Sequence, residues 1–375
     1  MKKRVLAAMM VFAMLFTCTA IADEAKKIKI GAAYPLTGNS AELGSRCYKG
    51  VKLAVDECNA NGGINGVEIE LVSQDDQADP KQAATIANLF ASDDDIICVF
   101  ADYNSSCTLA AAPIYNQYEI PQIAVGGSSP KITTAGDWTW RVYNSDTYRA
   151  SFDLQLILDG GYEKIGILYQ NDDFGTGALK VAQDMLAENG IEPLVAEGFL
   201  LGETKDFSTV ITKMKDAECD AVFLIADETE LAAFCTQCKQ LGFEPFMSAT
   251  GTFNPAVIDL GGDAVEGMVG DSYWDPSNPP ESVNEYVAKY KEAFDEDCTG
   301  DYTSPLCYDA TNLIIDILKN GATTREEVNK ALEEHMEVPF SGVVCDNVTF
   351  DEYGDVQILM TPVVIKDGDF ALYEQ

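Results

Sequence analysis

Short apolar runs alternate with amphipathic stretches along most of the chain. Runs such as "DIICVFAD" and "CDAVFLIADE" are continuously apolar, whereas "DPKQAATIANLFAS" carries apolar residues at helical spacing. Continuous apolar strands between amphipathic helices are typical of buried parallel sheets with right-handed crossovers. The alternation runs in two series, separated by "WTWRVYNSD". The pattern therefore predicts an α/β protein with two lobes.

The C-terminal part has a different pattern. Helical periodicity covers residues 281–298, 304–321 and 325–335 without strands between them, and a β-rich tail is expected over residues 341–374. We expect these helices to return to the first lobe and pack on it. Two domains also agree with the length, because 375 residues exceed what one ordinary hydrophobic core holds.

The first 22 residues predict export. Three basic residues precede an apolar run over residues 5–16, and the small residues of "AIA" follow at 20–22. This pattern indicates a secretory signal peptide, cleaved before Asp23. A membrane helix is one alternative, but the run is too short; a lipoprotein cut before Cys18 is another, but "LFT" before it is not small. We expect a mature chain in the periplasm or another extracytoplasmic space.

The net charge and the single histidine limit the kinds of partner, metal and cofactor that we expect. The chain has 25 Lys and Arg against 61 Asp and Glu, a formal net charge of −36. Such a chain repels nucleic acid and anionic lipid surfaces, so we expect neither as a partner. His335 follows a short predicted helix and is interpreted as an exposed helix-end residue. We therefore expect no metal site and no cofactor.

Eleven cysteines are present, and signal cleavage would leave ten. An exported protein can form disulfides, and Cys298 and Cys307, which flank a short polar loop, are the best candidate pair. Cys235 and Cys238 form a "CTQC" motif in the middle of a predicted helix. A redox CxxC belongs at a helix N-terminus, so we interpret this motif as packing or free thiols.

Ligands of open α/β sheets bind at the carboxyl ends of the strands. Four of the six loops expected there are rich in Gly, Ser or Thr, which offer close backbone approach and hydroxyl donors. The six loops are "PLTGNSAELG", "YNSSC" and "VGGSSP" in the first series, and "QNDDFGTG", "IADETE" and "SATGTF" in the second.

The loop "YNSSC" is the sharpest candidate for binding a ligand. Ser105 and Ser106 would lie at a helix N-terminus, where free N–H groups and the helix dipole favour negative charge. The neighbouring loop from Gly126 to Ser129, which contains Ser128, supplies more donors. A carboxylate fits these two loops without any Arg or Lys. The alternative is that the serines only cap the helix.

The second series offers groups for the other end of a ligand. Asp227, at a strand end, could hold an ammonium group or could cap the following helix, and Thr250 ends the next strand. A zwitterion with an apolar side chain would satisfy an anion site, a cation site and an apolar wall at once. The aromatic residues that could form this wall, or could be ordinary core between the lobes, are Phe174, Tyr273, Trp274 and Tyr302.

No catalytic set is recognisable in the sequence. It has no G-x-S-x-G, P-loop or HExxH motif, and its one histidine is poorly placed to serve a nucleophile. Binding needs fewer specialised groups than catalysis. A few charge-assisted hydrogen bonds of about 1.5–3 kcal/mol each, together with apolar burial, reach the roughly 8 kcal/mol of a micromolar complex. We therefore predict a binding protein rather than an enzyme.

Several segments resemble one family. "IKIGAAYPLTGNSAELG", "NANGGINGVEIELVSQDDQADPKQA" and "GILYQNDDFGTG" are similar to the branched-chain amino acid type (leucine/isoleucine/valine-binding) of ABC-transporter substrate-binding proteins. The resemblance implies a type I periplasmic-binding fold, with two Rossmann-like lobes, parallel central sheets and a three-segment hinge. It implies a signal peptide over residues 1–22, lobe 1 over residues 28–144 and 273–361, and lobe 2 over residues 145–272 and 362–375.

The resemblance also implies contacts to a ligand held between the lobes. Its α-carboxylate would be bound by Ser105 and by the small-residue loop that contains Gly126 and Ser128. Aromatic side chains would come from Phe174 and Tyr302. The carboxylate contacts agree with the anion site that the strand-end loops predict on their own.

Some positions depart from the family pattern. Asp227 stands where a Tyr is expected, Thr250 replaces the Glu that binds the ligand ammonium, and Leu43 replaces a Tyr of the first loop. The two positions of the family's early disulfide correspond to Ala78 and Asn104, so that bond is absent. Our hypothesis is that Asp227 takes over the ammonium group.

These observations predict a monomeric solute receptor that captures a small amino acid-like ligand by lobe closure and delivers it to the membrane permease of an ABC importer. A first alternative changes the ligand to an amide, a urea-like compound or an aromatic acid, which would suit the loss of the Glu. A second is a sensory module that presents its closed form to a chemoreceptor. An exported hydrolase is disfavoured because no nucleophile–base pair is present.

Overall fold

The computed structural model describes residues 27–251 and 254–374. The predicted signal peptide, residues 1–22, lies outside these described residues, and Cys18 lies outside them too. Within the described ranges, no helix is long and apolar enough to cross a membrane.

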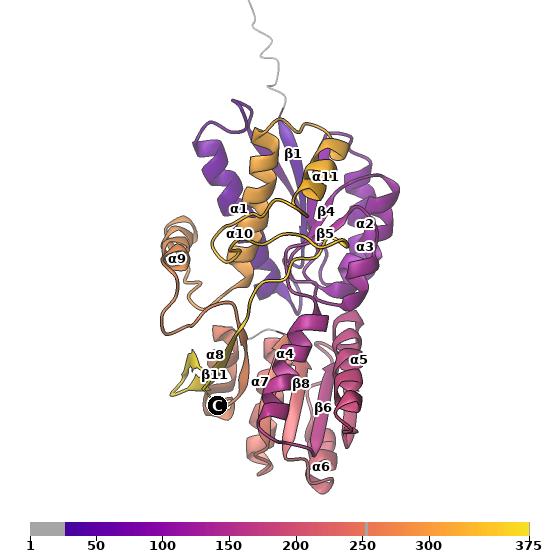
Figure 1. Ribbon diagram of the computed structural model, residues 1–375, viewed down its shortest axis with the longest axis vertical. Coiled ribbons are helices and arrows are strands. Elements are labelled where there is room, and N and C mark those ends of the chain that lie inside the picture. The colour runs from indigo at the N-terminus through magenta and orange to yellow at the C-terminus, as the bar shows by residue number, and fades with distance from the viewer. Residues whose placement is uncertain (1–26, 252–253, 375) are drawn as a thin grey trace, which may run out of the picture.

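The chain forms two α/β lobes that lie end to end (Figure 1), which confirms the predicted α/β class. Among the described residues, the first lobe has a five-stranded sheet in the order β2-β1-β3-β4-β5, and all neighbouring strands are parallel. Its strands are β1 (Ile28–Tyr34), β2 (Ile69–Asp75), β3 (Ile96–Ala101), β4 (Gln122–Ala124) and β5 (Thr139–Arg141), and the crossover helices are α1 (Ala41–Ala60), α2 (Pro80–Ala91) and α3 (Ser105–Gln117).

The second lobe has a larger sheet, whose described strands follow the order β12-β11-β10-β9-β8-β6-β7. The five strands from β6 to β10 are parallel, and the C-terminal pair is added antiparallel. The strands are β6 (Ile165–Gln170), β7 (Val195–Phe199), β8 (Ala221–Ala226), β9 (Phe246–Gly251), β10 (Val269–Ser272), β11 (Thr361–Lys366) and β12 (Asp369–Leu372), and the helices are α4 (Asp146–Asp159), α5 (Asp173–Glu188), α6 (Ser208–Asp216), α7 (Glu228–Gln240) and α8 (Pro255–Gly261).

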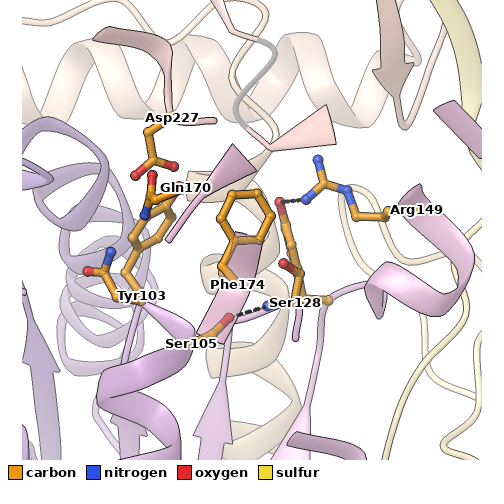
Figure 2. Close-up of a pocket in the computed structure, with 10 residues that line it drawn as sticks. Tyr103, Ser105, Ser128, Arg149, Gln170, Phe174 and Asp227 are labelled. Carbon is orange, nitrogen blue, oxygen red and sulfur yellow. Dashed lines mark hydrogen bonds between the residues drawn. The ribbon is translucent and has the colours of Figure 1, made fainter. Parts of the chain in front are cut away.

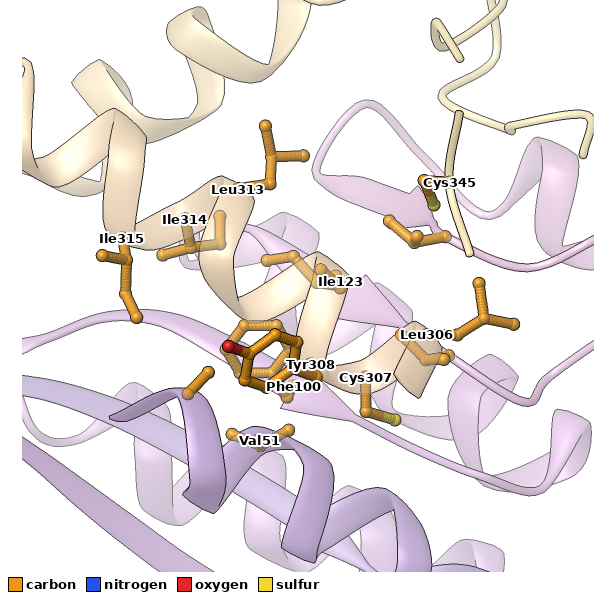
Figure 3. Close-up of a cluster of buried hydrophobic side chains, with 14 of the residues drawn as sticks. Val51, Phe100, Ile123, Leu306, Cys307, Tyr308, Leu313, Ile314, Ile315 and Cys345 are labelled. Atoms are coloured by element: carbon orange, nitrogen blue, oxygen red, sulfur yellow. The ribbon is translucent and has the colours of Figure 1, made fainter. Parts of the chain in front are cut away.

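Three further helices pack on the first lobe: α9 (Glu281–Phe294), α10 (Thr303–Lys319) and α11 (Arg325–Glu334). Helix α10 is buried along most of its length between α1 and the sheet (Figure 3). Its close approach to α1 requires a glycine, because a Cβ at Gly50 would lie 2.2 Å from the carbonyl oxygen of Ser304. A continuous apolar core thus joins residues that are about 250 positions apart in the sequence.

The chain crosses between the lobes three times, between β5 and α4, between β10 and α9, and before β11. The ends of the central strands of both sheets therefore meet at the junction, where a ligand site of an open α/β sheet belongs. The residue limits expected for the two lobes stay a prediction.

The sequence pattern did not resolve every element. Strand β5 and helix α4 lie in a stretch that the pattern left as a connection. The expected β-rich tail is only partly extended: β11 and β12 are strands, but residues 341–356 form isolated bridges. The reason lies in Asp309 of α10, whose carboxylate accepts the backbone N–H groups of Val343, Val344 and Cys345 in place of a strand partner.

The predicted disulfide between Cys298 and Cys307 is wrong, because both cysteines are free and buried. Cys307 turns its thiol toward the first lobe's β1 and α1, where its sulfur lies 3.8 Å from the hydroxyl of Tyr34. Cys235 and Cys238 lie on α7 and are buried free thiols, as predicted. His335 ends helix α11 but is half-buried, with Nδ1 2.8 Å from the carbonyl oxygen of Val338.

Candidate functional site

A cavity opens between the lobes at the carboxyl ends of the strands (Figure 2). It holds about 320 Å³ of space free of protein atoms, a figure that includes open solvent at its mouth. The first-lobe wall consists of Tyr103, Asn104, Ser105, Gly126 and Ser128, the second-lobe wall consists of Arg149, Gln170, Phe174 and Asp227, and Tyr143 of the first crossing completes the lining.

The first-lobe wall is built from the end of β3 and the start of α3. Ser105 is the first residue of α3, and its Oγ accepts the backbone N–H groups of Ser128 and Ser129, each at 3.2 Å. Because those bonds use the oxygen as acceptor, its own hydrogen can be donated into the cavity. The N-terminus of α3 adds a positive dipole end at the same place.

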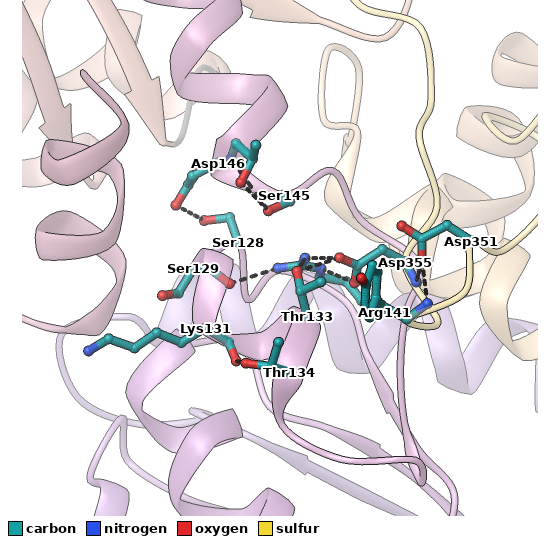
Figure 4. A network of polar contacts seen from close by, with 12 residues as sticks. Ser128, Ser129, Lys131, Thr133, Thr134, Arg141, Ser145, Asp146, Asp351 and Asp355 are labelled. Carbon is teal, nitrogen blue, oxygen red and sulfur yellow. Dashed lines mark hydrogen bonds and ion pairs between the residues drawn. The ribbon is translucent and has the colours of Figure 1, made fainter. Parts of the chain in front are cut away.

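The loop after β4 is shaped by a glycine and held by a buried arginine. Gly126 has φ +115°, and a Cβ there would lie 2.6 Å from the ring of Tyr103. Arg141 donates to the carbonyl oxygen of Ser129 at 2.9 Å and forms a buried ion pair with Asp355 of the C-terminal tail (Figure 4). The loop is therefore fixed from behind, which keeps its backbone aimed at the cavity.

Ser128 lines the cavity, but its backbone N–H donates to Ser105 Oγ and its carbonyl oxygen accepts from the N–H of Asp146. Its Oγ donates to Asp146 Oδ2 at 3.0 Å (Figure 4). Burial raises the pKa of Asp146 to about 6, although Arg149 acts in the opposite direction. The groups that can donate from the first-lobe wall are therefore the Ser105 hydroxyl, the backbone at Gly126 and the N-terminus of α3, a set that suits a carboxylate.

The second-lobe wall presents its side chains from α4, β6, α5 and the start of α7. Phe174 lies in the first turn of α5 and Asp227 is the residue before α7, yet Asp227 accepts no capping hydrogen bond from that helix. The helix-cap alternative for Asp227 is therefore not what the structure shows. Gln170 ends β6, and its Nε2 donates to Asp172 Oδ2 at 2.6 Å.

Arg149 brings a cation to the cavity that the sequence did not predict. It projects from α4, is almost fully buried, and donates to Asp271 at 3.1 Å, to the Tyr143 hydroxyl at 2.8 Å and to the Tyr302 hydroxyl at 3.2 Å. Tyr302 also meets Tyr273 edge to face, with ring centroids 5.0 Å apart. Tyr302 therefore supports the arginine from behind rather than lining the cavity.

Five predicted site residues are brought together at the cavity, namely Ser105, Gly126, Ser128, Phe174 and Asp227. Four others do not line it. Ser106 donates instead to Asp173 of α5 at 2.9 Å and so joins the lobes, Leu43 and Thr250 are buried, and Tyr302 contacts Arg149. That any of these nine residues contacts a ligand stays a prediction.

Sequence reasoning missed five lining residues. Tyr103 and Asn104 stand in the quoted "YNSSC" loop and Gln170 begins the "QNDDFGTG" loop, so reading those loops residue by residue would have found them. Tyr143 and Arg149 gave no such sign. The partner of Arg149, Asp271, is 122 positions away, and no local pattern encodes that pairing.

The lobes touch each other beside the cavity. In addition to the Ser106 contact, Lys131 of the first lobe forms an ion pair with Asp173 at 2.6 Å. The lobes are thus in a closed arrangement around a small, polar cavity.

Among residues 27–251 and 254–374, no group of three or more His, Cys, Asp or Glu side chains is arranged to hold a metal ion.

Comparison with known proteins identifies the family. Residues 27–369 match the periplasmic binding protein family, so the chain belongs to it. The leucine-, isoleucine-, valine-, threonine-, and alanine-binding protein of Pseudomonas aeruginosa is 30% identical over 374 residues, covering 96% of this chain and 94% of that protein. Members of this family are solute-binding proteins, and the predicted resemblance to leucine/isoleucine/valine-binding proteins is confirmed.

Solved structures show the same fold. The leucine binding protein LivK of Thermotoga maritima has a TM-score of 0.82 at 23% identity, covering 92% of this chain and 98% of that one. An ABC-transporter solute binding protein from R. palustris in complex with 4-hydroxybenzoate has a TM-score of 0.81 at 17% identity, covering 93% and 96%. These likenesses confirm the type I periplasmic-binding fold.

Proposed function

We propose that this protein is the extracytoplasmic receptor of an ABC importer, and that it clamps a small amino acid-like ligand between its lobes and delivers it to the membrane permease. The observation that carries the proposal is the cavity itself, where hydrogen-bond donors of the first-lobe wall and the carboxylate of Asp227 line the same space. It acts as a monomer, is exported by the segment over residues 1–22, and performs no catalysis.

The two walls together suit a zwitterion. The hydroxyl of Ser105, the backbone at Gly126 and the N-terminus of α3 bind the α-carboxylate, and Asp227 binds the ammonium group. Phe174 covers the carbon skeleton. Two such charge-assisted interactions at about 1.5–3 kcal/mol each, with the apolar contact added, reach the micromolar range.

Thermal unfolding of the mature protein tests this function. The panel contains the twenty amino acids, urea, short amides, 4-hydroxybenzoate and aliphatic acids without an amine. A ligand at about 100 times its Kd stabilises by about 2.7 kcal/mol, which raises the midpoint by several degrees. We expect amino acids to produce the largest rise. A response confined to compounds without an amine would contradict the proposal.

Arg149 favours a second candidate, a carboxylic acid without an amine. A buried guanidinium in the second-lobe wall could pair with a ligand carboxylate, and the R. palustris relative was crystallised with an aromatic acid. In this structure, however, Arg149 already pairs with Asp271 and two tyrosines. The same panel separates the candidates, because such an acid would act without any amino acid doing so.

A further inference from the structure

The amide of Gln170 is a polar group of the cavity that the anchors described above leave unused. Its side chain is 1% exposed and lines the cavity (Figure 2). Nε2 donates to the carboxylate of Asp172 at 2.6 Å, which fixes the direction of the amide, because a carboxylate accepts hydrogen bonds. Oε1 has no hydrogen-bond partner among the described residues. A buried acceptor in this state calls for a donor.

A second amide stands on the opposite wall. Asn104 is 9% exposed, lines the same cavity and donates from Nδ2 to Ser40 Oγ at 3.3 Å. Its Oδ1 likewise has no partner within the described part of the chain. The cavity therefore contains two buried acceptors besides the carboxylate of Asp227, one from each lobe.

We propose that Gln170 Oε1 and Asn104 Oδ1, together with Asp227, form a three-acceptor site for a primary ammonium group; this inference rests on the proposed function and specifies its ligand class. A primary ammonium carries three N–H donors, one for each acceptor. An N-methylated amine has only two N–H donors for the three acceptors, and an acid without an amine leaves Gln170 Oε1 and Asn104 Oδ1 without a donor. Burying an unpaired acceptor costs about tenfold in affinity or more.

The arrangement also couples the ligand to closure. Asn104 comes from the first lobe, and Gln170 and Asp227 come from the second. One nitrogen that binds all three is a bridge, and its bonds exist only when the lobes are closed. A ligand stabilises the closed form by as much as it prefers that form, so the ammonium group supplies this preference in addition to the carboxylate.

Isothermal titration of the mature protein and its Gln170→Met variant tests the inference. The probes are L-alanine, L-threonine and L-leucine, their N-methyl derivatives, and the corresponding acids without an amine. We expect the wild type to bind a primary amine at least tenfold more tightly than its N-methyl derivative. Gln170→Met should weaken the primary amine about tenfold and leave the amine-free acid unchanged, because only the amine meets Oε1.

A matched control and a second variant keep the test decisive. Gln155→Met removes a Gln–Asp hydrogen bond of the same kind on the outside of α4, where Nε2 lies 2.6 Å from Asp159, and should leave every affinity unchanged. If Gln170→Met fails to show a ligand-free unfolding transition near that of the wild type, Asn104→Leu carries the same prediction from the other lobe.

The outcomes distinguish failure of the three-acceptor site from failure of the proposed receptor function. Unchanged affinity for a primary amine in both Gln170→Met and Asn104→Leu overturns the three-acceptor site while the receptor function stands. A wild type that binds an acid without an amine, and none of the primary amines, overturns both. Loss of the preference for the primary amine in either variant supports the site.

Discussion

The two walls of the cavity present different chemical groups. The first-lobe wall offers backbone groups, one hydroxyl and the amide of Asn104, and its loop is held by hydrogen bonds from the N–H groups of Ser128 and Ser129 to Ser105 Oγ and by Arg141 behind it. The second-lobe wall offers side chains, including the carboxylate of Asp227 and the amide of Gln170, supported by long-range pairs such as Arg149 with Asp271.

This difference separates anchoring from discrimination. Backbone donors at a helix N-terminus bind any carboxylate of suitable size, so these donors of the first-lobe wall cannot distinguish one acid from another. Buried side-chain acceptors reject a ligand that leaves them unpaired. We infer that the choice of ligand resides mainly in the second-lobe wall.

The largest effect that we expect concerns the support of that wall. Arg149→Met leaves the fully buried carboxylate of Asp271 without its cation, and breaking a buried pair in this way costs about 3–5 kcal/mol. The free energy of unfolding of the ligand-free protein in urea should fall by that amount. Lys180→Met, which removes the exposed partner of Asp184, should change it by less than about 0.5 kcal/mol. Equal losses would contradict the structural role of the buried pair.

The next effect concerns the charge that faces the ligand. Asp227→Asn should weaken binding of an amino acid about 100-fold, because a charge-assisted hydrogen bond becomes a neutral one beside a buried cation. Titration calorimetry with the amino acid and its amine-free counterpart measures this effect. The amine-free acid should bind the variant at least as well as the wild type. A parallel loss for both ligands would place Asp227 outside the ammonium site.

A smaller and less selective effect is expected on the first-lobe wall. Ser105→Ala removes a donor to the carboxylate and the acceptor of two loop N–H groups, so affinity should fall about tenfold. Amino acids and amine-free acids should lose equally, in contrast to Asp227→Asn. Ser151→Ala, on the outer side of α4, serves as the control. A loss restricted to amino acids would reverse the assignment of the two walls.

The smallest effect is a dependence of closure on pH. Burial raises the pKa of Glu228 to about 7 in the closed structure, with Glu42 and Glu230 raising it and Arg46 lowering it. Opening exposes Glu228, whose pKa then returns toward its ordinary value of about 4.3. The closed form therefore binds the proton more tightly, and affinity should increase several-fold as the pH falls from 8 to 6. Glu228→Gln should remove this dependence, and an affinity that rises with pH would contradict it.

The sequence predicted the first-lobe wall better than the second. The strand-end rule and the helix N-terminus were enough to select Ser105, Gly126 and Ser128, because the groups that act there are local in the chain. Arg149 could not be found in this way, since two of its partners, Asp271 and Tyr302, lie more than 100 positions away in the sequence. Tyr302 was expected in the cavity because it is aromatic and because the family resemblance implied it, and no local pattern revealed its contact with Arg149.

For the fold too, features with a local signal in the sequence were predicted and features that depend on distant residues were not. The alternation of apolar runs and amphipathic stretches predicted the α/β class, because both signals are periodic and local. Strand β5 has only three residues, too few for a periodic pattern. The disulfide predicted between Cys298 and Cys307 was wrong because of the direction of a side chain, not because of the spacing of the two cysteines in the sequence. Helix α10 points the thiol of Cys307 at Tyr34.

The most direct test of the account compares two ligands on the unmodified mature protein. Titration calorimetry would measure the Kd of the amino acid that gives the largest thermal shift and the Kd of the same acid without its amine. The account predicts that removing the amine weakens binding at least 100-fold, because the charge-assisted hydrogen bond to Asp227 is lost and Gln170 Oε1 has no donor. Equal affinities, or tighter binding of the amine-free acid, would contradict it.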